Sequence, residues 1–462
     1  MRRSRDASIS RRRGGLVLTA ALLLAAGTGV PALADGPTAG PVTLADALQA
    51  VGSSSHAAEV AKLELAAARQ GTRAARASEL PKVDIGGGFT DRDSELVAVF
   101  GPFTAPLGDD TYWSYQVSAK YLLWDGGVRA SAIKAALAME EVAARGGASQ
   151  VVVAQLAGLG SYLRAMMAKA KRRAVRKRID AVKGHLAVVR NLYDQGIVAR
   201  NDLLETEVRL RRVQDADLAA ADDLAVAVRS LARLMGRDPA EPVDLPPALG
   251  PPAPLSAGED ELVRTALAAS PEIKALSAKL EAAQRRAELS RRDGMPQVFA
   301  QVAHTYEENP YLLHPNANVL FLGLSWNVFD GGARTARRRA TGIGVATAQR
   351  DLEEARRRVK NQVDAAFRAY RRALREAKTA ETNVKAAEEN LRIEEDQYRV
   401  GMVQSSDVLD AEAVLAESRF ALISRHYGAY LQQGTLLAVT GRDLVDFYRT
   451  PGGKTRREGG SS

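Results

Sequence analysis

The sequence predicts a mainly α-helical protein with a small β part, built as two internal repeats. Three observations support this fold class. A short motif around Asp125 recurs around Asp330, 205 residues later. A proline-free helical segment of about 68 residues follows each copy, and two strands with alternating polarity precede it. The composition agrees, since 46% hydrophobic and 26% charged residues are typical of a folded chain.

Cysteine and histidine usage narrows the possible functions. The 462 residues include no cysteine and five scattered histidines. A disulfide scaffold, a zinc ribbon, an iron–sulfur cluster and a thiol nucleophile are therefore excluded. The histidines show no metal-ligand spacing, and no nucleophile, base and orienting group converge. We expect neither an enzyme nor a bound cofactor or metal.

The chain begins with a basic segment followed by an apolar one. Six arginines precede the apolar residues 16–26, and the small residues Ala32 and Ala34 follow. An apolar core of about 11 residues is too short to span a bilayer comfortably and is typical of a secretory signal peptide. We predict a signal peptide over residues 1–34 and an exported chain. A disordered basic leader on a cytoplasmic protein is the alternative.

The first repeat is expected over residues 35–238. A segment rich in alanine, leucine, glutamate and arginine predicts a helix over 43–78. Strands follow near 83–90 and 113–123, and in the second of them apolar residues alternate with polar ones. The long helix then runs to Tyr193, and a shorter helix covers 202–234.

The second repeat is expected over residues 259–445, after a proline-rich crossover at 239–258 that neither helix nor sheet can absorb. The offset of 205 places its second strand near 320–328, and its later helices are expected near 332–399 and 407–439. Before the strand loop the offset is 215, which places its first strand near 298–305, after a helix near 259–293. The loop between the two strands is about ten residues longer in the first copy, and residues 446–462 are expected to form a flexible tail. Two strand-to-helix turns introduce the long helices, formed by Asp125, Gly126 and Gly127 and by Asp330, Gly331 and Gly332.

Helix length sets the architecture. A helix of about 68 residues is roughly 100 Å long, too long for the inside of a compact domain, so it belongs in a coiled coil or in the wall of a tube. The shorter helix after each long one returns about half of that length, and the helix before the strands supplies the other half. We therefore expect two shorter helices, stacked end to end, beside each long helix.

The strands have the length and alternation that transmembrane β-barrels use. An ordinary half-buried antiparallel sheet is the alternative. Four strands per chain cannot close a barrel, because the smallest barrels have about 8 strands. A barrel would therefore be shared by several chains.

The doubled motifs resemble TolC-type outer membrane efflux proteins. In each copy a strand ends in Trp/Phe-Asp-Gly-Gly-x-Arg, and after the long helix Tyr193 or Tyr398 opens the motif Tyr-x-x-Gly-x-x-x-x-x-Asp-x-Leu. The resemblance covers essentially the whole mature chain. It implies a homotrimer in which a twelve-stranded outer-membrane barrel continues into a long antiparallel α-helical tunnel through the periplasm.

The resemblance also implies a function and partners. The protein would be a passive exit duct of a tripartite efflux or type I secretion system, embedded in outer membrane lipid. Its partners would be a periplasmic adaptor protein and an inner-membrane pump of the RND, ABC or MFS type. Nucleic acid is not expected, because basic clusters at 171–178 and 356–358 are interpreted as solvated helix faces. An exported soluble coiled-coil protein with a structural or binding role is the alternative.

The turns between the helices contain the candidate site. Asp407 lies in the first turn of a helix, where negative charge is favoured, and Asp410 shares its helix face. The corresponding residues of the first copy, Asp202 and Glu205, are expected to form a capping-box-like pair. The resemblance implies that Asp407 and Asp410 form the pore constriction, and that Tyr398 and Asp202 help to hold neighbouring helix pairs closed.

Two further expectations come from the resemblance. The adaptor-tip contacts would be Gln195, Gly196, Ile197, Val400, Gly401 and Met402. Some family members have a basic residue that bridges the gate where this chain has Val403, so that bridge cannot form here.

Overall fold

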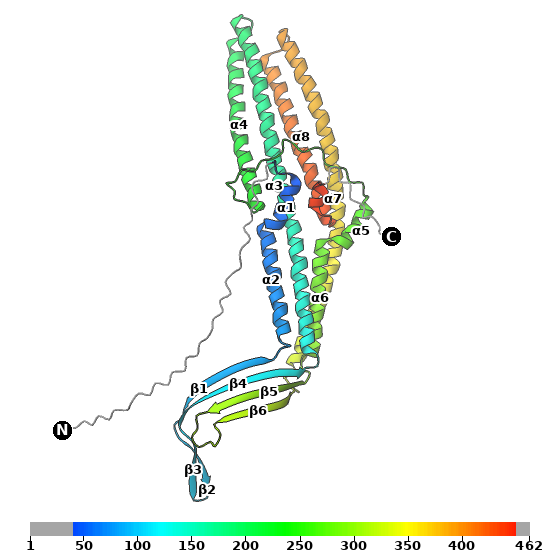
Figure 1. The fold of residues 1–462 in the computed structure, drawn as a ribbon. Coiled ribbons are helices and arrows are strands. Elements are labelled where there is room, and N and C mark those ends of the chain that lie inside the picture. The colour runs from blue at the N-terminus through cyan, green and yellow to red at the C-terminus, as the bar shows by residue number, and fades with distance from the viewer. Residues whose placement is uncertain (1–39, 450–462) are drawn as a thin grey trace, which may run out of the picture. The chain divides into compact units, whose positions relative to one another are not determined.

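The computed structural model describes residues 40–449. The predicted signal peptide and the part of the predicted tail after residue 449 lie outside this range. The described residues belong to one compact unit that starts at Pro41, and most of them are helical (Figure 1).

The elements follow the same order twice, which confirms a mainly α fold with two repeats. The first repeat contains α1 (Leu44–Ser54), α2 (His56–Ala77), β1 (Lys82–Asp91), β4 (Thr111–Trp124), α3 (Val128–Asp194) and α4 (Arg200–Leu234). The second contains α5 (Glu259–Ala269), α6 (Pro271–Arg292), β5 (Gln297–Glu307), β6 (Asn316–Ser325), α7 (Ala333–Arg399) and α8 (Ser405–Val439). Both long helices, α3 and α7, have 67 residues.

The helices predicted over 43–78 and 259–293 are each broken in two. Ser55 is extended and its side chain accepts a hydrogen bond from the backbone N–H of Ala58 (3.3 Å), so it caps α2. In the second repeat the break falls at Ser270, and Pro271 occupies the first turn of α6, where its missing N–H is tolerated. Each break separates a short helix from one of 22 residues that continues toward the strands.

The expected end-to-end stacking is confirmed. α4 lies along the C-terminal half of α3 and α2 along its N-terminal half, while α8 and α6 take the same places beside α7 (Figure 1). Ion pairs and hydrogen bonds cross these contacts, as between Thr72 Oγ1 and Glu140 Oε2 (3.0 Å). We call α3 with α4 the first hairpin, and α7 with α8 the second hairpin.

The four predicted strands form one antiparallel sheet in the order β1-β4-β5-β6. The longer loop of the first copy, predicted to have no strands, contains a separate hairpin of β2 (Leu96–Phe100) and β3 (Phe103–Gly108). The last strand was predicted to reach residue 328, but β6 ends at Ser325. Trp326, beyond its end, donates from Nε1 to the backbone oxygen of Gly294 (3.2 Å).

One face of the sheet is mostly apolar on all four strands, with Asn316 and the His304–Asn318 pair among its polar residues. Val83, Ala119, Val302 and Leu320 lie in one row of directly paired residues. Val83, Val302 and Leu320 are 63%, 54% and 72% exposed. Neighbouring residues on the strands, such as Ser118, point to the opposite face, because side chains alternate along a strand. The predicted alternation is therefore present, and none of residues 40–449 covers its apolar face.

The main hydrophobic core lies where both repeats and the crossover meet. It includes Leu48 of α1, Leu159 and Tyr162 of α3, and Leu437 of α8. The crossover contains neither helix nor strand, and side chains donate to its carbonyl groups, as Tyr430 Oη does to Gly250 (2.7 Å). Within residues 40–449, α3 is the one helix apolar enough over a sufficient length to cross a bilayer, and 39% of that stretch is buried.

The flexible tail was predicted to begin at residue 446, and this is wrong for residues 446–449. These residues continue a short helix, α9 (Leu444–Arg449). Phe447 and Tyr448 pack on the main core, and the Tyr448 hydroxyl lies 3.3 Å from Oε1 of Gln433. The burial of these two aromatic rings explains why the chain remains ordered beyond the second repeat.

Candidate functional site at the helix turns

The two strand-to-helix turns have the same hydrogen-bond pattern. Asp125 accepts from the backbone N–H of Gly127 (2.9 Å) and from the backbone N–H and Nε of Arg129 (2.8 and 3.1 Å). Asp330 accepts the same three bonds from Gly332 and Arg334. Both glycines of each turn have positive φ angles, between 64° and 90°. Each aspartate thus anchors the first turn of a long helix at the end of the sheet.

These bonds control the charge of the two carboxylates. Burial alone would raise the pKa of Asp125, but the backbone N–H groups of Arg129 and Gly127 and the Arg129 guanidinium outweigh burial and lower it. The pKa of Asp330 is also lowered, since the bonds and charge of Arg334 outweigh desolvation there. Both aspartates therefore stay ionised at pH values low enough to protonate an ordinary aspartate.

At the other end of the long helices, both turns end in the same glycine cap. Gly196 and Gly401 have φ angles of 74° and 76°. Gly196 N–H donates to Tyr193 O (2.8 Å) and Ile197 N–H to Leu192 O (2.9 Å), which is the Schellman pattern. The backbone of Gly401 and Met402 repeats both bonds. A side chain at either glycine would meet no atom within 4 Å, so the positive φ angle is what favours glycine there.

The residues predicted as adaptor-tip contacts lie together on these two turns. Ile197, Val400 and Met402 are 63%, 69% and 77% exposed. Gln195, Gly196 and Gly401 are exposed as well. Each tip therefore presents apolar side chains on a tightly capped backbone.

Behind the tips, Tyr398 is nearly buried in a small cluster that joins the two hairpins. Its ring contacts the His185 ring, with centroids 5.1 Å apart, and it packs with Val189 and Val408. Burial raises the pKa of Tyr398, and the charge of the half-buried Asp202 raises it further, while a side-chain contact with Ser405 opposes the shift. Asp202 therefore acts on Tyr398 through its charge within one chain, and among the described residues the buried Tyr398 hydroxyl has no hydrogen-bond partner.

The first turns of α4 and α8 differ from the expectation. Both helices begin two residues earlier than predicted, so Asp202 and Asp407 hold the third helical position. The predicted pair of Asp202 with Glu205 is wrong, because the N-cap residue of α4 is Ala199 and no side-chain hydrogen bond caps this helix. Asp407 instead reaches back and accepts from the backbone N–H of Gln404 (2.9 Å).

The two aspartates assigned to the constriction lie on the exposed side of α8. Asp407 is exposed, and the Asp410 side chain is 83% exposed. Asp410 lies 3.7 Å from Nη2 of Arg209 on α4, so its charge is partly balanced within the chain.

Sequence reasoning missed several contacts between helices, some joining the two hairpins and some within the first hairpin. Arg178 of α3 pairs with the buried Glu412 of α8 (2.8 Å), and His185 Nε2 lies 3.0 Å from Ser405 Oγ. Arg172 and Arg176, from the same basic cluster as Arg178, each lie 3.3 Å from Asp217 of α4. The interpretation of this cluster as a solvated face is therefore wrong for Arg172 and Arg178, whereas the Arg176 side chain is 58% exposed. The partners of all three are too distant in sequence for local spacing to reveal.

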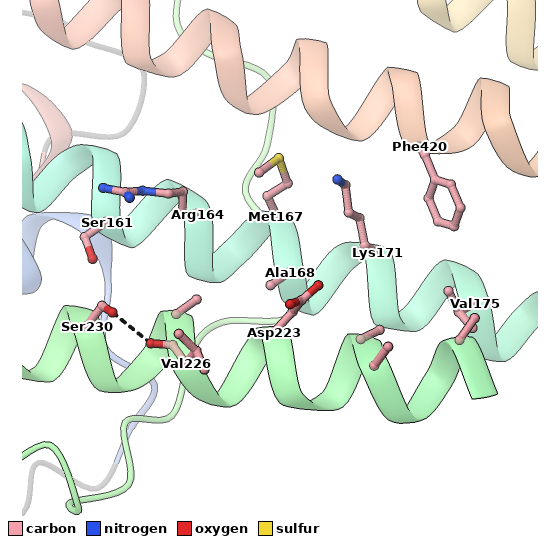
Figure 2. Close-up of a pocket in the computed structure, with 14 residues that line it drawn as sticks. Ser161, Arg164, Met167, Ala168, Lys171, Val175, Asp223, Val226, Ser230 and Phe420 are labelled. Carbon is pink, nitrogen blue, oxygen red and sulfur yellow. Dashed lines mark hydrogen bonds between the residues drawn. The ribbon is translucent and has the colours of Figure 1, made fainter. Parts of the chain in front are cut away.

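Away from the tips, a cavity of about 580 Å³ lies between α3 and α4 of the first hairpin, with Phe420 of α8 also contributing to its lining. Figure 2 shows Phe420 of α8 on the side opposite to Asp223, Val226 and Ser230 of α4, with α3 between them. None of the residues predicted for the site lines this cavity. Among residues 40–449, no group of three or more histidine and acidic side chains is placed to hold a metal ion.

Comparison with known proteins identifies the architecture. The sequence profile of the family described as "Outer membrane efflux protein" matches residues 47–237 and 262–442, which correspond to the two repeats. The curated protein CyaE of Bordetella pertussis is 29% identical over 267 residues, a match that covers 52% of this chain and 56% of CyaE. The chain thus spans about half the length of this curated relative.

Solved structures share the fold at low sequence identity. The outer membrane protein VceC of Vibrio cholerae is 16% identical, with a TM-score of 0.69 over 86% of this chain and 96% of VceC. The MtrE outer membrane channel of Neisseria gonorrhoeae, solved in its open state, is 17% identical, with a TM-score of 0.70 over 87% of this chain and 89% of MtrE.

Proposed function

The chain belongs to the outer membrane efflux protein family, and from this membership we propose that it is a passive homotrimeric exit duct through the outer membrane and periplasm. It performs no chemistry of its own. One observation carries the proposal: the same chain combines a four-stranded sheet that is mostly apolar on one face with two helical hairpins of nearly equal length.

The sheet supports an assembly of several chains. The strands at its two ends, β1 and β6, each have one edge that pairs with no other strand in the described part of the chain. Unpaired backbone N–H and C=O groups are too costly in a bilayer, so a membrane sheet must close on itself. Three copies would supply twelve strands, within the range of known barrels, and each β1 would pair with the β6 of a neighbouring copy.

The helices would continue the barrel as a tunnel. α3 and α7 start directly after β4 and β6, at turns fixed by Asp125 and Asp330. At about 1.5 Å per residue each of these helices extends roughly 100 Å. Their far ends carry the exposed apolar tips, where we propose that Gln195, Gly196, Ile197, Val400, Gly401 and Met402 contact a periplasmic adaptor. An inner-membrane pump of the RND, ABC or MFS type would supply the energy.

The acidic residues near the tips would narrow the conduit. In a closed ring of chains, Asp407 and Asp410 would concentrate negative charge in the lumen and form the constriction. Tyr398 and Asp202, which interact through the charge of Asp202, would help to hold the hairpins closed.

Electron microscopy of the detergent-purified mature protein tests the assembly. We expect three-fold cylinders with a tunnel at least roughly 100 Å long. Short globular particles or filaments would contradict the duct and favour an exported coiled-coil protein. As a second measurement, the protein should stay with the membrane fraction after carbonate or urea washing, and its release would count against the duct.

A further inference from the structure

A buried carboxylate lies where the two hairpins meet, and the proposed duct assigns it no role. Glu412 belongs to α8 and is 8% exposed, whereas Asp407 and Asp410, on the preceding turns, are exposed. Nε of Arg178, on α3, donates to Oε2 of Glu412 at 2.8 Å, and the two side chains are only 20% and 10% exposed. This ion pair therefore joins the first hairpin to the second hairpin, 234 residues apart in sequence.

Two other arginines influence Glu412 but are occupied elsewhere. Arg209 of α4 donates to the backbone oxygen of Leu409 (3.3 Å) and lies 3.7 Å from Asp410. Arg419 of α8 pairs with Glu388 of α7 at 2.8 Å. Both lower the pKa of Glu412 through their charge alone, whereas Arg178 acts through its charge and its hydrogen bond. Arg178 is therefore the main partner of this carboxylate.

The balance of forces at Glu412 depends on Arg178. Removing a carboxylate from water is costly, and the cost is recovered only when good geometry and a paired charge compensate it. Burial raises the pKa of Glu412 in spite of the three arginines, so the ionised group is only partly compensated. When one partner of such a pair is lost, the remaining buried charge is strongly destabilising. Without Arg178, the contact between α3 and α8 would thus become unfavourable while Glu412 stays ionised.

We infer that Arg178 is a positioning residue that lets the two hairpins pack closely over the Glu412 carboxylate, and that it thereby limits the width of the conduit beside the tips. The effect of Arg178 on conduit width rests on the proposed function. Its effect on the distance between the hairpins rests only on contacts within the chain. The two effects can be measured separately.

Hairpin spacing can be measured in the purified full chain by spin labelling, because the chain contains no cysteine. Ile197→Cys and Met402→Cys place one label on each exposed tip. Dilution with unlabelled protein restricts the distance to one chain. The variants are Arg178→Met, Glu412→Gln and the double variant. Arg425→Met is the matched control, because the Arg425–Glu376 pair (2.9 Å) lies within the second hairpin.

We expect Arg178→Met to shift the distance distribution to longer values, and the double variant to restore it, because a neutral amide needs no arginine. Glu412→Gln alone should leave the distribution no broader than in the parent, because its amide oxygen can still accept from Arg178 and the Arg178 side chain, 20% exposed, keeps some contact with water. Arg425→Met should leave the distribution unchanged. An unchanged distribution in Arg178→Met, or a double variant as wide as Arg178→Met, would overturn the inference. If Arg178→Met does not fold, a broader distribution in Glu412→Gln still overturns it.

The same variants in planar bilayers test the link to the conduit. The fraction of time that the channel spends at its open conductance should rise about tenfold in Arg178→Met, a conservative figure for a broken buried ion pair. In the double variant this fraction should return to the value of the parent protein. If spacing changes but occupancy does not, the limit on conduit width is wrong. If the parent protein passes no current at all, the proposed duct fails, and the distances still decide the positioning role.

Discussion

At the residue scale, Asp125 offers the sharpest prediction about stability. Asp125→Asn removes the charge that attracts the Gly127 and Arg129 N–H groups and the Arg129 guanidinium. We expect a loss of about 1–2 kcal/mol in the free energy of unfolding near neutral pH, because charge-assisted bonds at a helix start are replaced by weaker ones. Thermal unfolding of the variant beside the parent protein measures this.

The pH dependence of that loss follows from the lowered pKa of Asp125. A carboxylate with a pKa lower in the folded than in the unfolded state stabilises the fold above the unfolded value, near 3.8. This contribution disappears as the pH falls through the lower folded value. The parent and Asp125→Asn should therefore converge in stability in strong acid. A constant difference across the acid range would contradict this role of the charge.

The sequence revealed some of these residues and not others, for a physical reason. Asp125 and Asp330 stand out because one local motif occurs twice, and its bonds span only four residues. Arg178 and Glu412 belong to different repeats, and their pairing depends on the packing of α3 against α8. Charge patterns within one helix carry no signal for such a contact.

At the element scale, strand β4 permits a test with a matched control. Val117 lies on the apolar face, between Ile85 and His304, and Ser118 lies on the opposite face. If the apolar face meets lipid, Val117→Lys should destabilise the barrel by about 2–4 kcal/mol near mid-bilayer and by less toward its edges. Ser118→Lys should be tolerated. The measurement is the amount of trimer that remains in the outer membrane fraction for each variant. Equal losses of trimer in the two variants would contradict the faces assigned to Val117 and Ser118.

Element boundaries were predictable where periodicity is strong and less so at breaks. The repeat, with offsets of 205 after the strand loop and 215 before it, and the alternation of β4 located the long helices and all four strands of the main sheet. The breaks at Ser55 and Ser270 escaped notice because serine fits both a helix and a cap, and because a proline is compatible with the first turn of a helix. The β2–β3 hairpin was missed because its strands are only 5 and 6 residues long.

At the scale of the whole molecule, several features of the single chain lack partners. The sheet has two open edges and an exposed apolar face, and the tips expose Ile197, Val400 and Met402. Exposed apolar surface at such places marks contacts with lipid or protein. The trimer, the membrane and the adaptor each account for one of these surfaces, so the proposed assembly explains all three together.

The proposed assembly also predicts unequal roles for the two acidic rings. Asp410 lies 3.7 Å from Arg209, whereas the bond described for Asp407 is to the uncharged Gln404 backbone N–H. The Asp407 ring should therefore contribute more negative potential to the lumen, because no nearby guanidinium offsets it in this contact.

Asp407→Asn should consequently reduce cation selectivity more than Asp410→Asn, while its amide oxygen can still accept from Gln404 and preserve the start of α8. Reversal potentials across a salt gradient in planar bilayers measure the selectivity of both variants and of the double variant. An equal or larger effect of Asp410→Asn would show that Arg209 does not screen Asp410 in the trimer. Unchanged selectivity in the double variant would remove both residues from the constriction, because a ring of six carboxylates in a narrow lumen cannot be neutralised without changing its potential.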